Sequence, residues 1–169
     1  MAGEYMIDTN VFITAKNIFY AFDLAPGFWD KLKREIVVGH CCVIDAVDTE
    51  IMDGHEEDLV TWWTEIKKDY TGIVKKAKED AKVFSVYKEI SEQVYKDPVF
   101  GEREKLRFLS RGDPWLIAAA KMWNMNLVTL EKMAGPGTKS IKIPDICQRE
   151  GVNYTNPYDM MRKLNIKLR

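Results

Sequence analysis

The chain has 169 residues, of which 46% are hydrophobic and 30% are charged, and its formal net charge is −1. This composition is typical of one globular domain with its own core, and it excludes a disordered or fibrous chain. No segment is apolar enough over a sufficient length to span a membrane, and the N-terminus lacks the pattern of a signal peptide. We therefore expect a cytoplasmic protein that does not contact the membrane.

The first third of the chain alternates between strand and helix patterns. Short runs rich in Val and Ile predict buried strands, and apolar residues at helical spacing predict amphipathic helices. In chain order we expect a strand at 5–7, a helix at 10–20, a helix from Pro26, a strand at 36–44 and a helix at 45–52.

The middle of the chain, residues 56–95, has a helical pattern without a strand pattern. Leu59, Trp63 and Ile66 recur at helical spacing, and Gly72 separates two predicted helices. We interpret residues 56–100 as a helical insertion or cap on an α/β core.

The last third returns to alternating elements. In "RGDPWLIAAAKMW", Asp113 is predicted to cap a helix and Pro114 to occupy its first position. "NLVTLEKM" predicts a strand at 127–130, and "SIKIPDIC" predicts a short strand followed by a helix that starts near Pro144. Such alternation indicates a single α/β domain over residues 1–169. Its architecture would be three-layer α/β/α, with a central, largely parallel sheet of about four or five strands.

Four acidic residues follow strands or begin helices near the same predicted edge of this sheet. Asp8 and Glu131 end strands, Glu50 lies just after the second strand, and Asp113 opens the helix before the third. Ligand sites of open parallel sheets lie at the carboxyl ends of the strands. Four carboxylates gathered there would repel one another, and Mg²⁺ or Mn²⁺ would relieve the repulsion.

Each of these acids also has a simpler interpretation. Asp8 and Asp113 could only cap helices, Glu50 could be a surface residue, and Glu131 could be an exposed turn residue. Asp145, just after Pro144, could either begin a helix or reach the acidic group. These alternatives stay open at the level of sequence.

The segments "MIDTNVFI", "DTEI", "GDPWLIAAA" and "LVTLEKM", in this order, resemble the PIN (PilT N-terminus) domain family. "PGFW", "IPDIC" and the helical middle resemble one subfamily of it. The resemblance implies a PIN-like fold and a metal site formed by Asp8, Glu50, Asp113 and Glu131, where Glu131 replaces the Asp of a Thr-x-Asp pattern. Asn10 and Thr129 match positions that orient the acids.

The family includes ribonuclease toxins of toxin–antitoxin pairs. The resemblance therefore implies an Mg²⁺- or Mn²⁺-dependent endoribonuclease that hydrolyses single-stranded RNA. An antitoxin protein would be its partner, and a homodimer its assembly. Lys75, Lys76 and Arg111 are weaker candidates for RNA contacts. Stacking on RNA bases is open to Trp62, Trp63, Trp115 and Trp123, although their helical spacing favours core packing.

The alternative function is a catalytically weak PIN domain that binds protein or RNA, because a fold does not fix its function. A phosphatase with a nucleophilic Asp is a poorer fit. Such enzymes place a second Asp two positions after the first for acid–base work, and this chain has Asn10 there.

Overall fold

The core of the protein is one five-stranded sheet in which every neighbouring pair of strands is parallel. The computed structural model describes residues 4–168. The strands are β1 (Tyr5–Ile7), β2 (Cys41–Ile44), β3 (Val74–Lys75), β4 (Asn126–Val128) and β5 (Tyr154–Thr155). Their order across the sheet is β3-β2-β1-β4-β5. This arrangement confirms the predicted α/β fold with a parallel central sheet.

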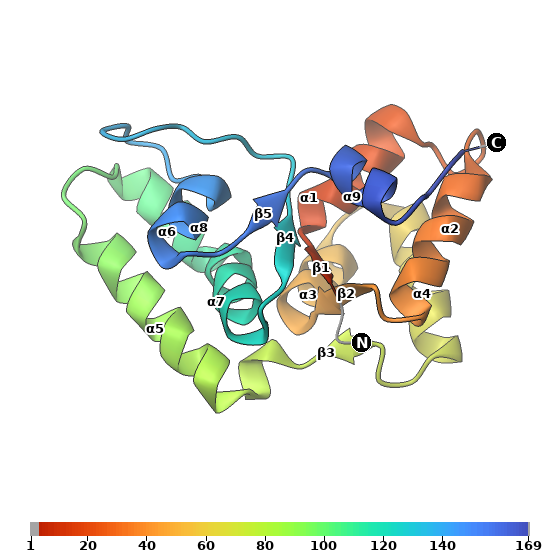
Figure 1. Cartoon of the computed structure of the whole chain (residues 1–169), viewed down its shortest axis with the longest axis horizontal. Helices are drawn as coiled ribbons and strands as arrows, with labels where there is room; N and C mark the ends of the chain where they lie inside the picture. The colour runs from red at the N-terminus through yellow and green to blue at the C-terminus, as the bar shows by residue number, and fades with distance from the viewer. Residues whose placement is uncertain (1–3, 169) are drawn as a thin grey trace.

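Helices cover both faces of the sheet, as a parallel sheet requires. They are α1 (Thr9–Thr14), α2 (Pro26–Val37), α3 (Asp45–Asp53), α4 (Glu57–Asp69), α5 (Ala81–Lys96), α6 (Glu102–Ser110), α7 (Asp113–Trp123), α8 (Ile143–Glu150) and α9 (Pro157–Lys163). Helices α5 to α8 lie on one side, and α1, α2, α4 and α9 lie on the other (Figure 1). Within residues 4–168, no helix combines the length and apolarity needed to cross a membrane.

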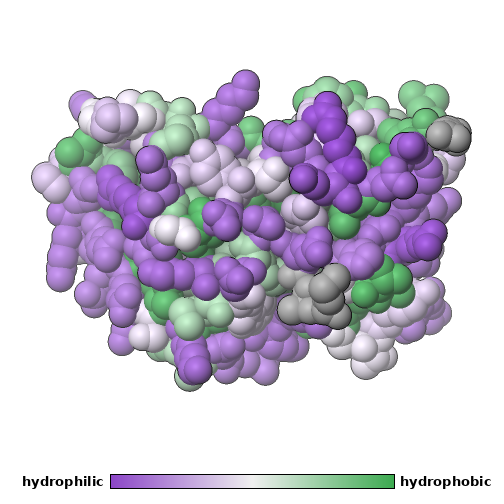
Figure 2. Space-filling view, in the orientation of Figure 1, coloured by the Kyte–Doolittle hydropathy of each residue, from purple (hydrophilic) through white to green (hydrophobic). Residues whose placement is uncertain are grey.

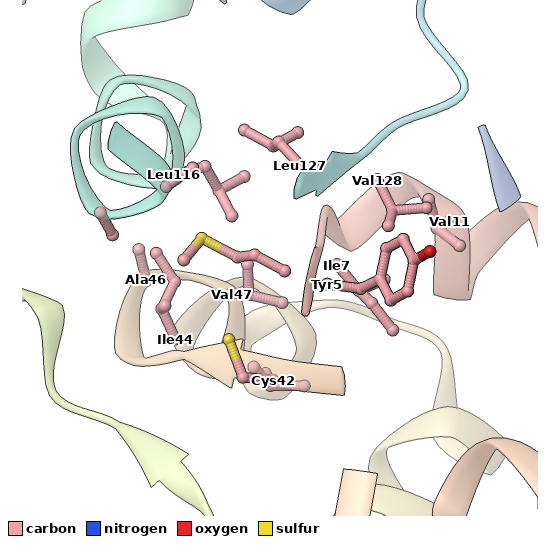
Figure 3. Close-up of a cluster of buried hydrophobic side chains, with 14 of the residues drawn as sticks. Tyr5, Ile7, Val11, Cys42, Ile44, Ala46, Val47, Leu116, Leu127 and Val128 are labelled. Carbon is pink, nitrogen blue, oxygen red and sulfur yellow. The ribbon is translucent and has the colours of Figure 1, made fainter. Parts of the chain in front are cut away.

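The hydrophobic core lies between the sheet and its helices. Met6 and Ile7 of β1 have no exposed surface, and neither have Leu127 and Val128 of the neighbouring β4 (Figure 3). Hydrophilic side chains dominate the surface seen in Figure 2, with smaller apolar areas between them. The apolar interior explains why the strands β1 and β2 consist of buried, mostly apolar residues, since both of their faces are covered.

The predicted strand at 36–44 is wrong in its first half. Ile36 and Val37 complete helix α2, because Ile36 lies on the same buried face as Phe28, Trp29 and Leu32. Gly39 then adopts a positive φ of 90°, which ends the helical path, and the strand begins only at Cys41. A Val- and Ile-rich run therefore contains a helix end and a strand.

The short strand predicted in "SIKIPDIC" is also wrong. The backbone of Ile141 is hydrogen-bonded by side chains instead of by a neighbouring strand. Its N–H donates to Glu104 Oε2 at 3.1 Å, and its carbonyl accepts from Arg107 Nη2 at 2.6 Å. The fifth strand is instead Tyr154–Thr155, which pairs with β4.

The middle segment contributes to the sheet as well as to the helical layers. Residues 56–100 include α4 and α5, as expected, but also β3, which pairs with the carboxyl end of β2. The expectation of a wholly helical segment is therefore wrong at Val74–Lys75. One partly buried and one exposed residue carry too little hydrophobic periodicity to be recognised as an edge strand.

The packing of β1 predicts the cost of truncating its last residue. Ile7→Ala should lower the free energy of unfolding by about 2–5 kcal/mol, because the fully buried side chain leaves a cavity in the core. The matched control is Leu24→Ala, whose side chain is 83% exposed and whose loss should cost less than about 0.5 kcal/mol. Urea unfolding measures both, and equal effects would contradict the assigned core.

Candidate active site

The register of β1 and β4 brings Asp8, the first of the four acids, close to the segment that carries Glu131, the last of them. Ile7 lies opposite Val128, so Asp8 and Thr129 emerge together from the carboxyl edge of the sheet. Thr129 Oγ1 donates to Asp8 Oδ2 at 3.2 Å and accepts from the backbone N–H of Glu131 at 3.1 Å. One hydroxyl therefore links the ends of the two central strands.

Glu50 reaches the same edge from helix α3, which follows β2. Its Oε1 accepts from the backbone N–H of Gly112 at 2.8 Å. A Cβ on residue 112 would clash with Glu50 Oε1 and lie 3.3 Å from Ala46 Cβ, so glycine at this position lets the Glu50 carboxylate lie where it does. Gly112 is the N-cap of α7, and Asp113 is the first residue of that helix. Glu50 therefore fixes the start of α7 next to α3.

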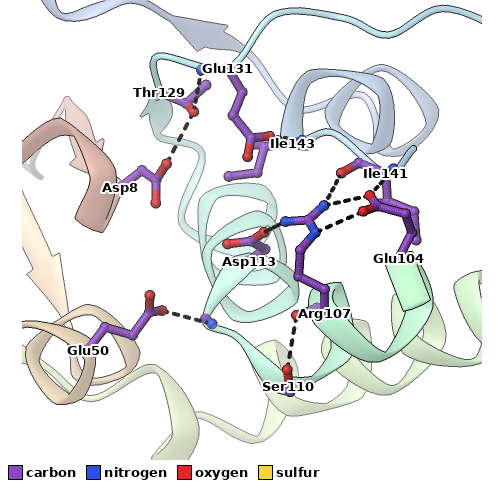
Figure 4. A network of polar contacts seen from close by, with 11 residues as sticks. Asp8, Glu50, Glu104, Arg107, Ser110, Asp113, Thr129, Glu131, Ile141 and Ile143 are labelled. Carbon is purple, nitrogen blue, oxygen red and sulfur yellow. Dashed lines mark hydrogen bonds and ion pairs between the residues drawn. The ribbon is translucent and has the colours of Figure 1, made fainter. Parts of the chain in front are cut away.

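Asp8, Glu50, Asp113 and Glu131, which we call the acidic cluster, point into a common space (Figure 4). Asp8 is only 2% exposed and Asp113 only 7%. Neither aspartate makes a side-chain hydrogen bond that caps its helix, although Asp8 is the N-cap residue of α1. The prediction that Asp113 caps α7 is wrong, because Gly112 occupies that position. Helix capping therefore does not account for these two buried carboxyl groups.

Burial and the neighbouring acids raise the pKa values of the two aspartates of the cluster. The pKa of Asp8 is raised to about 8, first by burial and then by the charges of the other three acids. The pKa of Asp113 is raised to about 7, first by burial and then by Glu131 and Glu50. Burial also raises the pKa of Glu50, and the Gly112 amide opposes this shift. Burial and the nearby acids therefore favour the protonated forms of Asp8 and Asp113 when no cation is bound.

A clamp on helix α6, formed by Glu104 and Arg107, supports two of the acids. Arg107 Nη2 donates to Glu104 Oε2 at 3.0 Å, and Arg107 Nη1 lies 4.0 Å from Asp113 Oδ2. The clamp holds both backbone groups of Ile141, and two residues later the N–H of Ile143 donates to Glu131 Oε2 at 2.7 Å. Sequence reasoning missed the clamp, because only the three-residue helical spacing of its members is visible there.

The two residues predicted to support the acids differ in position. Thr129 is 2% exposed and makes the bonds described above. Asn10 is exposed, and its side chain takes part in none of the hydrogen bonds found within residues 4–168. The adjacent Thr9 is the buried residue, and its hydroxyl lowers the pKa of Glu50.

The predicted basic residues differ in how they relate to the acidic cluster, and Asp145 makes its hydrogen bonds to a loop. Arg111 is close enough to lower the pKa of Glu50 and Asp113, whereas the exposed Lys75 ends β3 and Lys76 pairs with Glu79 at 3.5 Å. Asp145 accepts from the N–H groups that precede Pro136. Its bonds are to Ala134 at 2.8 Å and Gly135 at 3.0 Å.

The chemistry of the acidic cluster fits a hard divalent cation. Its donors are carboxylate oxygens, which Mg²⁺ and Mn²⁺ prefer. The buried Thr9 hydroxyl lies beside Glu50 and adds a neutral oxygen to these donors. As they stand, no three His, Cys, Asp or Glu side chains among residues 4–168 are close enough together to hold an ion.

The parallel sheet and its two helical layers form the PIN-like three-layer α/β/α fold that the sequence predicts. The chain belongs to the family described as "Domain of unknown function (DUF4411)", whose model matches residues 5–168. Among solved structures, the chain is similar to one in "Crystal structure of VapBC2 from Rickettsia felis bound to a DNA fragment from their promoter". The TM-score is 0.53 at 16% identity, and the match covers 90% of this chain and 97% of that chain. This likeness shows the fold alone. No curated protein matched the sequence.

The raised pKa of Asp8 predicts how stability depends on pH without a cation. Between about pH 4 and pH 8 the folded chain keeps a proton on Asp8 that the unfolded chain has released, so stability falls as the pH rises. Asp8→Asn removes this contribution, and the variant should gain on the wild type by a few kcal/mol between pH 5 and pH 8.

Urea unfolding in EDTA at both pH values measures this effect. The exposed Asp23→Asn is the control and should follow the wild type. If Asp8→Asn shows the same pH dependence as the wild type, the acids do not repel one another as described.

Proposed function

We propose that this chain is a metal-dependent endoribonuclease that hydrolyses single-stranded RNA. One observation carries the proposal. Four carboxyl groups lie at the carboxyl edge of a parallel sheet, and the two aspartates among them are buried, do not cap their helices and have raised pKa values. Strongly shifted pKa values at neighbouring acids are concentrated at the functional sites of proteins.

Mg²⁺ or Mn²⁺ would be held by Asp8, Glu50, Asp113 and Glu131. When bound, such an ion activates water and stabilises charge on a phosphodiester. The chain's own groups orient the acids: Thr129 holds Asp8, the Gly112 amide holds Glu50, and the Ile143 amide holds Glu131.

Room for an RNA strand lies beside the cluster. A groove of about 700 Å³ opens at Glu131, and Lys132 and Arg162 are among the residues that line it. Cations beside a carboxylate site would hold the flanking phosphates while the acids face the scissile one. The single-stranded form suits this site because the backbone must approach partly buried acids.

We further infer a role as the toxin of a toxin–antitoxin pair, with an antitoxin as the partner and a homodimer as the assembly. The support is the fold shared with a chain of the VapBC2 complex, together with the motif resemblance to PIN toxins.

The first test of the nuclease is Asp8→Asn. Loss of this carboxylate should weaken metal binding and lower the rate of RNA cleavage by about a hundredfold or more, since several kcal/mol of barrier reduction depend on the ion. The thermal stability in EDTA should hold or rise, because one member of a repelling group is neutralised. Cleavage of single-stranded RNA with Mg²⁺ or Mn²⁺, with EDTA as control, measures the activity.

Two outcomes would contradict the proposal in different ways. Cleavage that survives both EDTA and Asp8→Asn would remove the metal from the mechanism. A pure wild-type protein that cleaves no RNA in the presence of either metal would instead favour the catalytically weak binding module.

A second test uses the close contact at Gly112. Gly112→Ala should displace the Glu50 carboxylate, a flexible group, and so reduce Mn²⁺ affinity and cleavage at least tenfold, while stability falls by only about 1 kcal/mol. Gly101→Ala is the matched control. It also changes a helix N-cap glycine, but its added Cβ meets only Lys139, at 3.8 Å or more. Titration calorimetry and thermal melts separate the two effects, and an unchanged Mn²⁺ affinity would contradict the role of Glu50.

A further inference from the structure

Three aromatic rings from α5 and α7 form a nearly parallel group outside the core. Tyr87 stacks on Trp115 with centroids 3.8 Å apart and an angle of 8° between the planes. Phe84 lies 6.1 Å from Trp115 at 23° and 6.2 Å from Tyr87 at 21°. Phe84 is 46% exposed, and the other two rings are partly exposed. We call these three residues the aromatic platform.

Two lysines lie over the rings of the platform. Lys78 Nζ is 5.9 Å from the centroid of Trp115, and Lys88 Nζ is 5.7 Å from that of Phe84. Neither lysine belongs to a salt bridge found within residues 4–168. Both lysines are exposed residues, so an anionic ligand can reach them.

Helix α7 and Lys78 connect the platform to the acidic cluster. Trp115 follows Asp113 by two residues on the first turn of α7. Lys78 lowers the pKa of Glu50, as does Arg111, so both cations lie near that acid. The backbone of Lys78 is fixed there, because its N–H donates at 3.0 Å to Asp45 Oδ2 on α3, the helix that carries Glu50.

We propose that the platform binds a nucleobase of single-stranded RNA by stacking on Trp115, with Lys78 and Arg111 contacting the adjacent phosphates. This inference rests on the proposed nuclease function and names where its substrate binds. Aromatic faces flanked by cations are how proteins hold single strands without a strict sequence preference. Tyr87 stacks on the Trp115 ring and so fixes its position. Because Lys78 lies near Glu50, a phosphate bound to Lys78 would lie near that acid too.

The experiment measures binding of a short labelled single-stranded RNA by fluorescence anisotropy in EDTA, where cleavage is suppressed. Trp115→Leu keeps an apolar side chain but removes the aromatic face, and it should weaken binding about tenfold or more. Trp115→Phe keeps a stacking face and should retain most of the affinity. Tyr95→Leu is the matched control: it removes a 69% exposed ring at the other end of α5 and should bind as the wild type does.

The salt dependence of binding tests the phosphate contacts separately. Lys78→Gln should reduce the slope of log affinity against log salt by about 0.7, the value for one contact to a single strand. Lys96→Gln is the control: it removes an exposed lysine at the carboxyl end of α5, paired with Glu92, and should leave the slope unchanged. This arm still decides the question if a thermal melt shows that Trp115→Leu does not fold.

The proposal is overturned if Trp115→Leu, folded, binds RNA as the wild type does, or if Lys78→Gln leaves the salt slope unchanged. A wild type that binds no single-stranded RNA also overturns it and assigns the platform to a protein partner. Failure of the nuclease is distinguishable, because it would appear as Trp115-dependent RNA binding without cleavage. Cleavage that is independent of Trp115 would fail the platform alone.

Discussion

Mutual repulsion of buried carboxyl groups is the constraint around which this fold is arranged. Parallel strands deliver Asp8 and Glu131 to one edge, and the helices after β2 and before β4 deliver Glu50 and Asp113 to it. Burial alone raises the pKa of a carboxyl group, and each neighbouring charge raises it further. The fully buried hydrophobic core around β1 supplies stability that offsets the cost of burying these carboxyl groups.

The acids are held by donors that belong to different segments, so no single segment sets the geometry. Thr129 and the amides of Gly112 and Ile143 each hold one acid, while Arg107 lies beside Asp113 and also ties down Ile141. Each donor offsets part of the repulsion without removing the negative charge. The segment before α8 is therefore held by side chains of α6 and not by pairing with the sheet. Because Arg107 also lies beside Asp113, and Ile143 in turn holds Glu131, the position of this segment depends on the same contacts as the site.

Sequence reasoning identified the parts of the molecule that depend on local patterns. The apolar run at β1, the acids that follow strands and Pro114 at the start of α7 are all local, and they were sufficient for the fold. The strand predicted near Ile141 failed because Glu104 and Arg107, far away in sequence, occupy its backbone groups. The two-residue strands β3 and β5 have no periodicity to detect. Gly112 and Lys78 likewise gain their importance only from contacts made in three dimensions.

The net charge of −1 conceals an ordered separation of charge around the site. The acidic cluster occupies the carboxyl edge of the sheet, and Arg111 and Lys78 lie near enough to lower the pKa of Glu50. Cations at that distance do not neutralise the acids, since the pKa of Asp113 remains raised although Arg107 and Arg111 oppose the shift. Binding of an anionic strand needs cations along its backbone, and metal-dependent cleavage of that strand needs acids that hold the metal at one phosphate. Because the two charges compensate over the whole chain, near-neutrality does not argue against nucleic-acid binding, and the local arrangement of charge decides the question.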